Sequence, residues 1–158
     1  MSSVTDRWIP TTDRDQIVRE ALVAVRSFTD SMDRLHGVLR SDMDMNGSDL
    51  AALRMLIVRE QRGEWVSPHE IAKHLAISTA STTKLLDRLA ERGHIERRPH
   101  PADRRSRIIV LTEHARTEFS RHLGSRMAKM RGVMDGYSDD ELRAVARFLD
   151  DMDKAMVD

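Results

Sequence analysis

The chain has 158 residues, of which 40% are hydrophobic and 33% charged, and this length favours one compact domain over several. Its 26 basic and 26 acidic residues give a net charge of zero, which excludes a polybasic tail or an acidic disordered protein as the basis of function. The absence of cysteine excludes disulfides, thiolate metal sites and thiol catalysis. Residues Met1 to Asp15 lack an apolar run of signal-peptide length, and no segment reaches the roughly 18 apolar residues of a membrane span. We therefore expect a soluble, cytoplasmic protein that does not contact the membrane.

The N-terminal third of the chain carries a helical pattern. Apolar residues between Asp13 and Met45 recur at steps of three and four, which predicts one long amphipathic helix. A polar stretch follows, and Ser48 can cap a second helix that ends near Gly63. We expect residues 1–47 to form an N-terminal arm that contains a dimerisation helix.

Two short helices are predicted next. Ser67 to Glu70 have the composition of a capping box with proline at the first helical position, which begins a short helix. Ser78 can cap another helix, which Gly93 ends and whose inward face is formed by Thr82, Leu85, Leu86 and Leu89. Two helices joined by about three residues form a helix-turn-helix.

After Gly93 the pattern changes to two short strands, residues 94–98 and 107–111, with both prolines in the loop between them. Residues 97–107 contain five arginines and one acid, a net charge of +4. A long basic hairpin beside a helix-turn-helix is typical of a wing. Residues 48–112 are therefore predicted to be a winged helix-turn-helix domain.

The C-terminal residues again predict helices. Thr112 can cap one that runs to Gly136, and Ser138 with Glu141 forms a second capping box that begins the last helix. We expect residues 113–158 to be C-terminal dimerisation helices. The fold class is mainly α with a small β-hairpin wing.

Apolar residues on both arms predict a symmetric dimer. Met32, Leu35 and Leu39 on the first arm, and Leu142, Val145, Leu149 and Met152 on the second, extend over several helical turns. A dimer with intertwined arms would bury them, and a monomer folded back on itself is the alternative. Residues 135–158 carry eight acids and three bases, so this end repels phosphate while the wing attracts it.

The helix that begins at Ser78 has an outward face suited to a DNA groove. A step of 100° per residue places Ala80, Lys84 and Asp87 opposite the inward face, with Ser81, Thr83 and Arg88 beside them. From Thr79 to Lys84 there is no acid, so small polar side chains and one lysine can approach base edges. The alternative is an ordinary surface helix rich in serine and threonine.

These residues resemble the MarR family of bacterial transcriptional regulators. The resemblance rests on Asp87-Arg88-Leu89 in the second helix, the helix-ending Gly93, the Asp103-Arg104-Arg105 wing and the Leu111-Thr112 that follows it. It implies a homodimer that places its recognition helices in successive major grooves of a pseudo-palindrome and its wings in the flanking minor grooves. It further implies a repressor that a small aromatic or otherwise amphipathic ligand releases from double-stranded DNA.

The resemblance also assigns roles to residues. Thr79, Ala80, Ser81, Thr83 and Lys84 fall on base-reading positions, Arg105 on the wing tip, and Asp103 on the acid that braces the wing. Arg88 matches a position that contacts phosphate or pairs with the wing acid. The full predicted DNA contacts are Ser78, Thr79, Ala80, Ser81, Thr83, Lys84 and Arg88 on the helix and Arg98, Arg104, Arg105 and Arg107 on the wing.

Other kinds of site have weaker signals. His69 and His74 are five residues apart and point about 140° away from each other, and His114 and His122 are too far apart to share an ion alone, so no metal ligands and no cofactor are predicted. No catalytic motif is present, so we expect no enzyme. The ten methionines are core filler or line an adaptable pocket, for which Met32, His36 and Trp65 are the candidate residues. A metal-responsive regulator and a winged-helix module that binds protein are the alternative functions.

Overall fold

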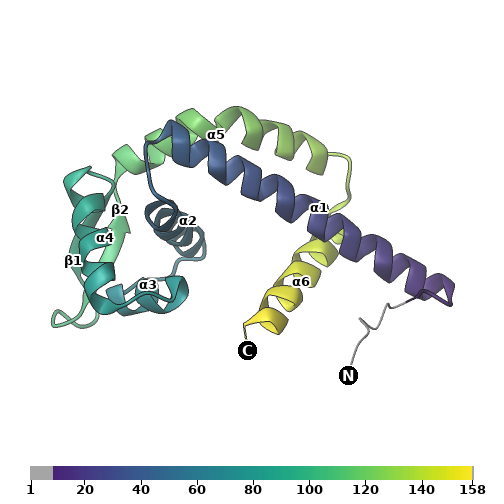
Figure 1. Ribbon diagram of the computed structural model, residues 1–158, viewed down its shortest axis with the longest axis horizontal. Helices are drawn as coiled ribbons and strands as arrows, with labels where there is room; N and C mark the ends of the chain where they lie inside the picture. Colours follow the sequence, from purple (N-terminus) through teal and green to yellow (C-terminus); the bar gives the residue numbers. More distant parts are fainter. Residues whose placement is uncertain (1–8, 158) are drawn as a thin grey trace, which may run out of the picture. The chain divides into compact units, whose positions relative to one another are not determined.

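The computed structural model describes residues 9–157, and it is mainly helical with one β-hairpin, as predicted (Figure 1). Residues 1–8 and Asp158 lie outside the described residues. The prediction that Met1 to Asp15 contain no signal peptide falls partly on them. The chain divides after Met55 into two compact units. Among the described residues, every helix is too short or too polar to cross a lipid bilayer.

The first unit contains the predicted long helix, α1 (Asp13–Asp42), and the beginning of α2 (Gly47–Gln61). The N-cap of α1 is Thr12, which forms a capping box with Asp15. The prediction that Ser48 caps α2 is wrong, because the Asn46 side chain accepts the Asp49 N–H at 2.8 Å and the helix has already begun. The buried residues of this unit are Leu39, Met43, Met45, Asp49, Leu50, Ala52, Leu53 and Met55.

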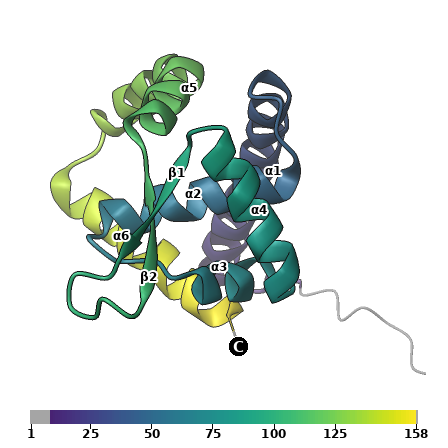
Figure 2. The same cartoon turned by 90° about the vertical axis from the view of Figure 1, so that its left-hand side faces the viewer.

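The second unit contains the helix-turn-helix, α3 (Pro68–Leu75) and α4 (Thr79–Glu91), which lie side by side in Figure 2. Both predicted N-caps are confirmed: Ser67 and Glu70 form a reciprocal capping box, and Ser78 accepts the Ser81 N–H. The turn between the helices passes through Ala76, whose φ of +52° lies in the left-handed region. The predicted inward residues Thr82, Leu85, Leu86 and Leu89 are all buried.

The predicted hairpin is confirmed as β1 (Ile95–Pro99) paired antiparallel with β2 (Arg107–Leu111), and Figure 2 shows the two strands side by side. The prediction that both prolines lie in the loop is wrong for Pro99, which ends β1 opposite Arg107. Proline is tolerated there because the end of an edge strand needs no N–H donor. The N–H of Ile109 also donates to the Val66 carbonyl at 2.8 Å, which ties the hairpin to the segment before α3.

Two further helices complete the second unit, α5 (Glu113–Met134) and α6 (Asp139–Met156). Their predicted caps are confirmed, since Thr112 accepts the Ala115 N–H and Ser138 forms a capping box with Glu141. In α5 only Ala115 and Phe119 are buried, and α6 buries none of its residues. The apolar stripe predicted for α6 therefore stays uncovered in a single chain.

Candidate nucleic-acid interface

The outward face of α4 is exposed over its whole length. Of the backbone N–H groups at the helix start, that of Ser81 donates to the N-cap Ser78 hydroxyl, and no acidic residue lies in the first turn. The side chains on this face are small from Thr79 to Thr83, and Lys84 follows. All seven residues predicted to contact DNA from this helix are exposed: Ser78, Thr79, Ala80, Ser81, Thr83, Lys84 and Arg88.

Local hydrogen bonds hold the hydroxyl groups of this face in place. The Ser78 hydroxyl accepts the Ser81 N–H at 3.1 Å and lies 3.0 Å from the Ser81 hydroxyl. The Thr83 hydroxyl donates to the Thr79 carbonyl at 3.1 Å. Both the Ser81 and Thr83 oxygens keep acceptor capacity, so they can pair with donor groups on a ligand.

The one acid at the centre of this face is neutralised from the hairpin. Arg97 of β1 places Nη2 2.6 Å from the Oδ1 of Asp87. The carboxylate therefore adds little net negative charge to the face. The same ion pair links β1 to α4.

The loop of the wing is organised by Asp103. Its Oδ1 accepts the Arg105 N–H at 3.0 Å, and its Oδ2 accepts the Ser106 hydroxyl at 3.0 Å. Its carbonyl also accepts the Ser106 N–H at 3.0 Å. Three hydrogen bonds to one residue give the loop a defined shape without a hydrophobic core.

The wing arginines differ in how far they are already engaged. Arg98 donates from Nε and Nη2 to the Glu96 carboxylate, at 2.9 and 2.6 Å. Within residues 9–157, the guanidinium groups of Arg104, Arg105 and Arg107 form no ion pair, and all three are exposed. These three arginines are available to an anionic ligand, whereas Arg98 would first have to leave Glu96.

The residues predicted to line a ligand pocket are distributed over different hollows. His36 lines a hollow of about 170 Å³ in the first unit, together with Asp33, Arg40 and Arg54. Burial lowers the pKa of His36, and the nearby positive charge of Arg54 lowers it further. Trp65 lines a groove of about 380 Å³ in the second unit, and the linings of these two hollows do not include Met32.

The groove at Trp65 is the more apolar of the two. Its lining includes Leu56, Val66, Ile109 and Leu111 beside the indole, with Glu60 and Glu64 as charged groups. Its volume falls within the range of small-molecule sites, roughly 300–1,000 Å³, and the hollow at His36 falls below that range. The indole itself is 52% exposed.

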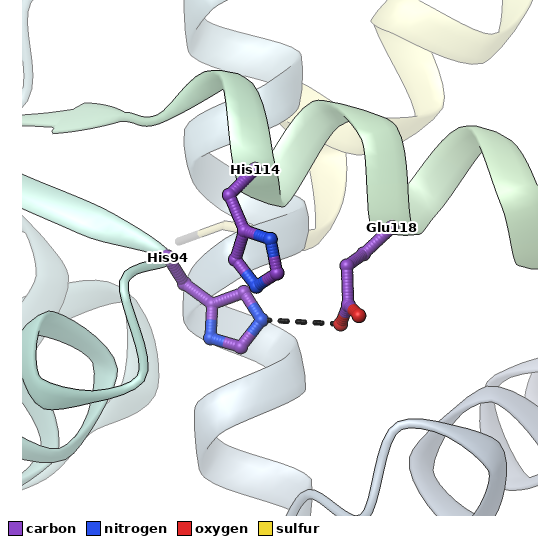
Figure 3. A group of neighbouring side chains, drawn as sticks. All are labelled: His94, His114 and Glu118. Atoms are coloured by element: carbon purple, nitrogen blue, oxygen red, sulfur yellow. Dashed lines mark hydrogen bonds and ion pairs between the residues drawn. The ribbon is translucent and has the colours of Figure 1, made fainter.

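A second polar cluster joins the end of α4 to the start of α5, and the sequence analysis did not find it. Figure 3 shows His94, His114 and Glu118 pointing toward one another. The His94 Nε2 lies 3.3 Å from the Glu118 Oε2, and the two imidazole rings are 5.2 Å apart between centroids. The available signals were the four-residue spacing of His114 and Glu118 on one helix and a histidine directly after the helix-ending Gly93.

Burial, hydrogen bonding and neighbouring charges set the pKa values of His94 and Glu118. His94 is 2% exposed, and this desolvation lowers its pKa despite the neighbouring carboxylate. Burial raises the pKa of Glu118, but the hydrogen bond from His94 and the nearby imidazoles outweigh that effect and lower it overall. The cluster at neutral pH therefore consists of a neutral His94 beside an ionised carboxylate.

The segment that contains this helix and hairpin has recognisable relatives. Residues 43–106 match the MarR family, and this segment includes α2, α3, α4, β1 and the wing loop. The repressor YetL of Bacillus subtilis, described as an HTH-type transcriptional repressor, is 32% identical over 98 residues, which are 62% of this chain and 59% of YetL. Over residues 43–106 the chain is therefore similar to MarR-family proteins.

Solved structures of MarR-family and related proteins share the fold. A mutant of MepR from a multidrug-resistant S. aureus clinical isolate superposes with a TM-score of 0.68 at 18% identity, over 86% of this chain and 96% of that one. Another S. aureus MepR mutant, bound to an oligodeoxyribonucleotide, superposes with a TM-score of 0.53 at 18% identity, over 86% of this chain and 97% of that one. The chain spans less than two thirds of the length of the first curated relatives it matches.

Proposed function

We propose that this chain is a sequence-specific DNA-binding transcriptional regulator of the MarR family. The observation that carries the proposal is the exposed, acid-free surface of α4 from Thr79 to Lys84, which lies in the same unit as the arginine-rich wing. A helix of this kind fits the major groove, and arginines on a hairpin fit phosphates or a narrow minor groove. The repressor name of YetL and the DNA-bound MepR mutant support it.

The two parts of this surface have different tasks in the proposal. The polar residues of α4 discriminate bases, because hydroxyl and ammonium groups pair with base edges. Arg104, Arg105 and Arg107 hold phosphates and orient the protein, while Asp103 keeps the loop in the shape that presents them. Arg88 contacts the backbone from the far end of α4, and Arg98 contributes only if it exchanges Glu96 for phosphate.

The working form in this proposal is a homodimer. The α6 residues Val145, Phe148 and Leu149 are 39–49% exposed, and on α1 Ile17, Val23 and Phe28 are 52–58% exposed. A second copy of the chain is the partner that can cover these exposed apolar residues. Residues 1–47 and 113–158 then serve as dimerisation arms, and residues 48–112 serve as the DNA-binding part.

Repression with release by a small ligand is the regulatory part of the proposal. The apolar groove beside Trp65 has the volume for a small aromatic or amphipathic molecule, and its lining includes three residues of β2, Ile109, Val110 and Leu111. A ligand there lowers DNA affinity only if it binds the DNA-competent arrangement less tightly than the other one. Thermal stabilisation by members of a panel of aromatic acids, lost in Trp65→Ala, is the expected result.

Selection of bound duplexes from a random library by the purified protein tests the main proposal. The expected winner is a pseudo-palindrome with half-sites about one helical turn, near 10 bp, apart. A winged-helix module that binds protein is the competing function, and it predicts no enrichment of any sequence. Enrichment of a single half-site without symmetry would contradict the homodimer and leave the DNA-binding proposal standing.

A further inference from the structure

Three potential metal ligands converge in the second unit outside the proposed DNA interface. His94 lies three residues beyond the end of α4, and His114 and Glu118 lie one turn apart on α5 (Figure 3). One nitrogen from each histidine and one carboxylate oxygen all lie within 4.8 Å of one another. The three groups come from two different elements, so an ion bound by them would join those elements.

The backbone around His94 is fixed on both sides. Its N–H donates to the Leu89 carbonyl at 2.9 Å, and its carbonyl accepts the Thr112 N–H at 3.1 Å. The Thr112 hydroxyl also donates to the Gly93 carbonyl. These hydrogen bonds hold the backbone of His94 between the end of α4 and the beginning of α5, in the absence of any ligand.

The polar atoms of this cluster are only partly used. The Nε2 of His94 has Glu118 as its partner, and within the described chain the buried Nδ1 has no hydrogen-bond partner. The other oxygen of Glu118 accepts from Arg121 at 3.1 Å, which orients the carboxylate from outside.

The geometry suits a tetrahedral ion. Ligand atoms at zinc bond lengths of about 2.0–2.1 Å lie roughly 3.3 Å apart around a tetrahedron. The His94 Nε2 and Glu118 Oε2 already have a separation of 3.3 Å. His114 is exposed, so its ring can rotate toward the other two atoms without disturbing the core.

We propose that His94, His114 and Glu118 form a binding site for a divalent first-row transition-metal ion, with Zn²⁺ as the occupant the donors suit best. Two imidazoles and a carboxylate are ligands that zinc accepts, and a water molecule fills the fourth position. The ion fixes the end of the recognition helix to α5. It therefore stabilises one orientation of α4, which makes DNA affinity metal-dependent; this second step rests on the proposed function.

Direct binding of Zn²⁺ to the untagged, chelator-treated protein tests the site. We expect isothermal titration calorimetry at pH 7.5 to give one Zn²⁺ per chain. Glu118→Gln keeps the shape of the side chain, and His114→Gln changes an exposed residue, so both variants should fold. Each should weaken binding at least about tenfold, since each removes one of three ligands.

His122→Gln is the matched control, because this histidine lies two turns further along the same helix. Its zinc affinity should equal that of the unchanged protein. An absence of zinc binding by the unchanged protein would overturn the proposal. So would zinc affinities of Glu118→Gln and His114→Gln that equal that of His122→Gln. Thermal unfolding followed with and without Zn²⁺ gives a second readout, and the melting temperature should rise in the unchanged protein and in His122→Gln only.

The regulatory step has a separate readout. Affinity for the selected duplex, measured with Zn²⁺ and with chelator, should differ in the unchanged protein and not in Glu118→Gln. Zinc binding without any effect on DNA affinity would keep the site and overturn its regulatory role. An absence of duplex binding under both conditions, with zinc binding intact, would count against the proposed function instead.

Discussion

Arg97 on β1 and Asp87 on α4 form an ion pair, with 2.6 Å between Nη2 and Oδ1, that neutralises the negative charge at the centre of the outward face of α4. Both side chains are substantially exposed, so the pair contributes little to stability. Its importance lies in the electrostatics of the surface proposed to bind DNA.

Removing Arg97 should therefore weaken DNA binding more than it weakens the fold. We expect Arg97→Ala to lower duplex affinity about tenfold, because a positive charge is lost and the Asp87 carboxylate faces phosphate unpaired. Fluorescence anisotropy with a labelled duplex measures the change. In the double variant Arg97→Ala, Asp87→Asn, part of the affinity should return, and no recovery would contradict this role of the pair.

The contribution of each wing arginine to DNA affinity should depend on whether an acidic residue of the chain already binds it. We expect Arg105→Ala to weaken binding to all duplex sequences by a similar factor and to reduce the salt slope by about one. Arg98→Ala is the control, because Arg98 is already engaged by Glu96 and should matter less. Equal losses from the two substitutions would contradict this ranking.

Lys84 should affect sequence preference more than overall affinity. It is exposed on the acid-free part of α4, and a lysine there can donate to guanine acceptors. Repeating the duplex selection with Lys84→Ala should change the preferred base at one or two positions of each half-site. Lys73→Ala on α3 is the comparison, and an unchanged preference in Lys84→Ala would assign Lys84 to phosphate alone.

The capping box of α3 should make stability depend on pH. Partial burial raises the pKa of Glu70, but its hydrogen bonds from Ser67 and Arg59 outweigh that effect and lower it overall. The stabilisation is therefore present above the unfolded pKa and is lost as pH falls through the lower folded value.

Glu70→Gln isolates that effect. We expect a loss of about 0.5–1 kcal/mol in the free energy of unfolding at pH 7, reduced by solvent screening of this half-exposed carboxylate. Urea unfolding at neutral and acidic pH should show the difference from the unchanged protein shrinking as the pH falls. A difference that is independent of pH would assign the loss to packing.

The apolar stripe on α6 should control the oligomeric state. Leu149 is 45% exposed in a single chain, and Leu149→Glu places a charge on the surface proposed to meet a second copy. We expect sedimentation velocity to show a shift from dimer to monomer. Arg147→Glu changes the charge about 160° around the helix from Leu149, on the opposite face, and should leave the dimer intact.

Local signals in the sequence predicted much of this fold. The residues Ser67, Ser78, Thr112 and Ser138 were correctly predicted as helix caps, because a cap depends only on the residues within one turn. The predicted cap at Ser48 is wrong because Asn46, two residues earlier, offers an equivalent side-chain acceptor. Sequence alone does not rank two such neighbours.

The parts that depend on tertiary contacts were harder to predict. His94 and Glu118 are 24 residues apart and meet only because the hairpin brings the chain back to the end of α4. The spacing of His114 and His122 concerns one helix only and carries no information about that return. The pairing of Arg97 with Asp87 also requires the register of β1 against α4, which no local pattern specifies.

The central claim is that α4 and the wing bind a specific DNA sequence, and a salt titration tests it most directly. Affinity is measured over a range of salt concentrations for the selected duplex and for a scrambled duplex of the same composition. We predict a linear fall of log affinity with log salt for both, with the selected duplex bound at least about 10³-fold more tightly. Equal affinity for both duplexes, or affinity that does not respond to salt, would contradict the account.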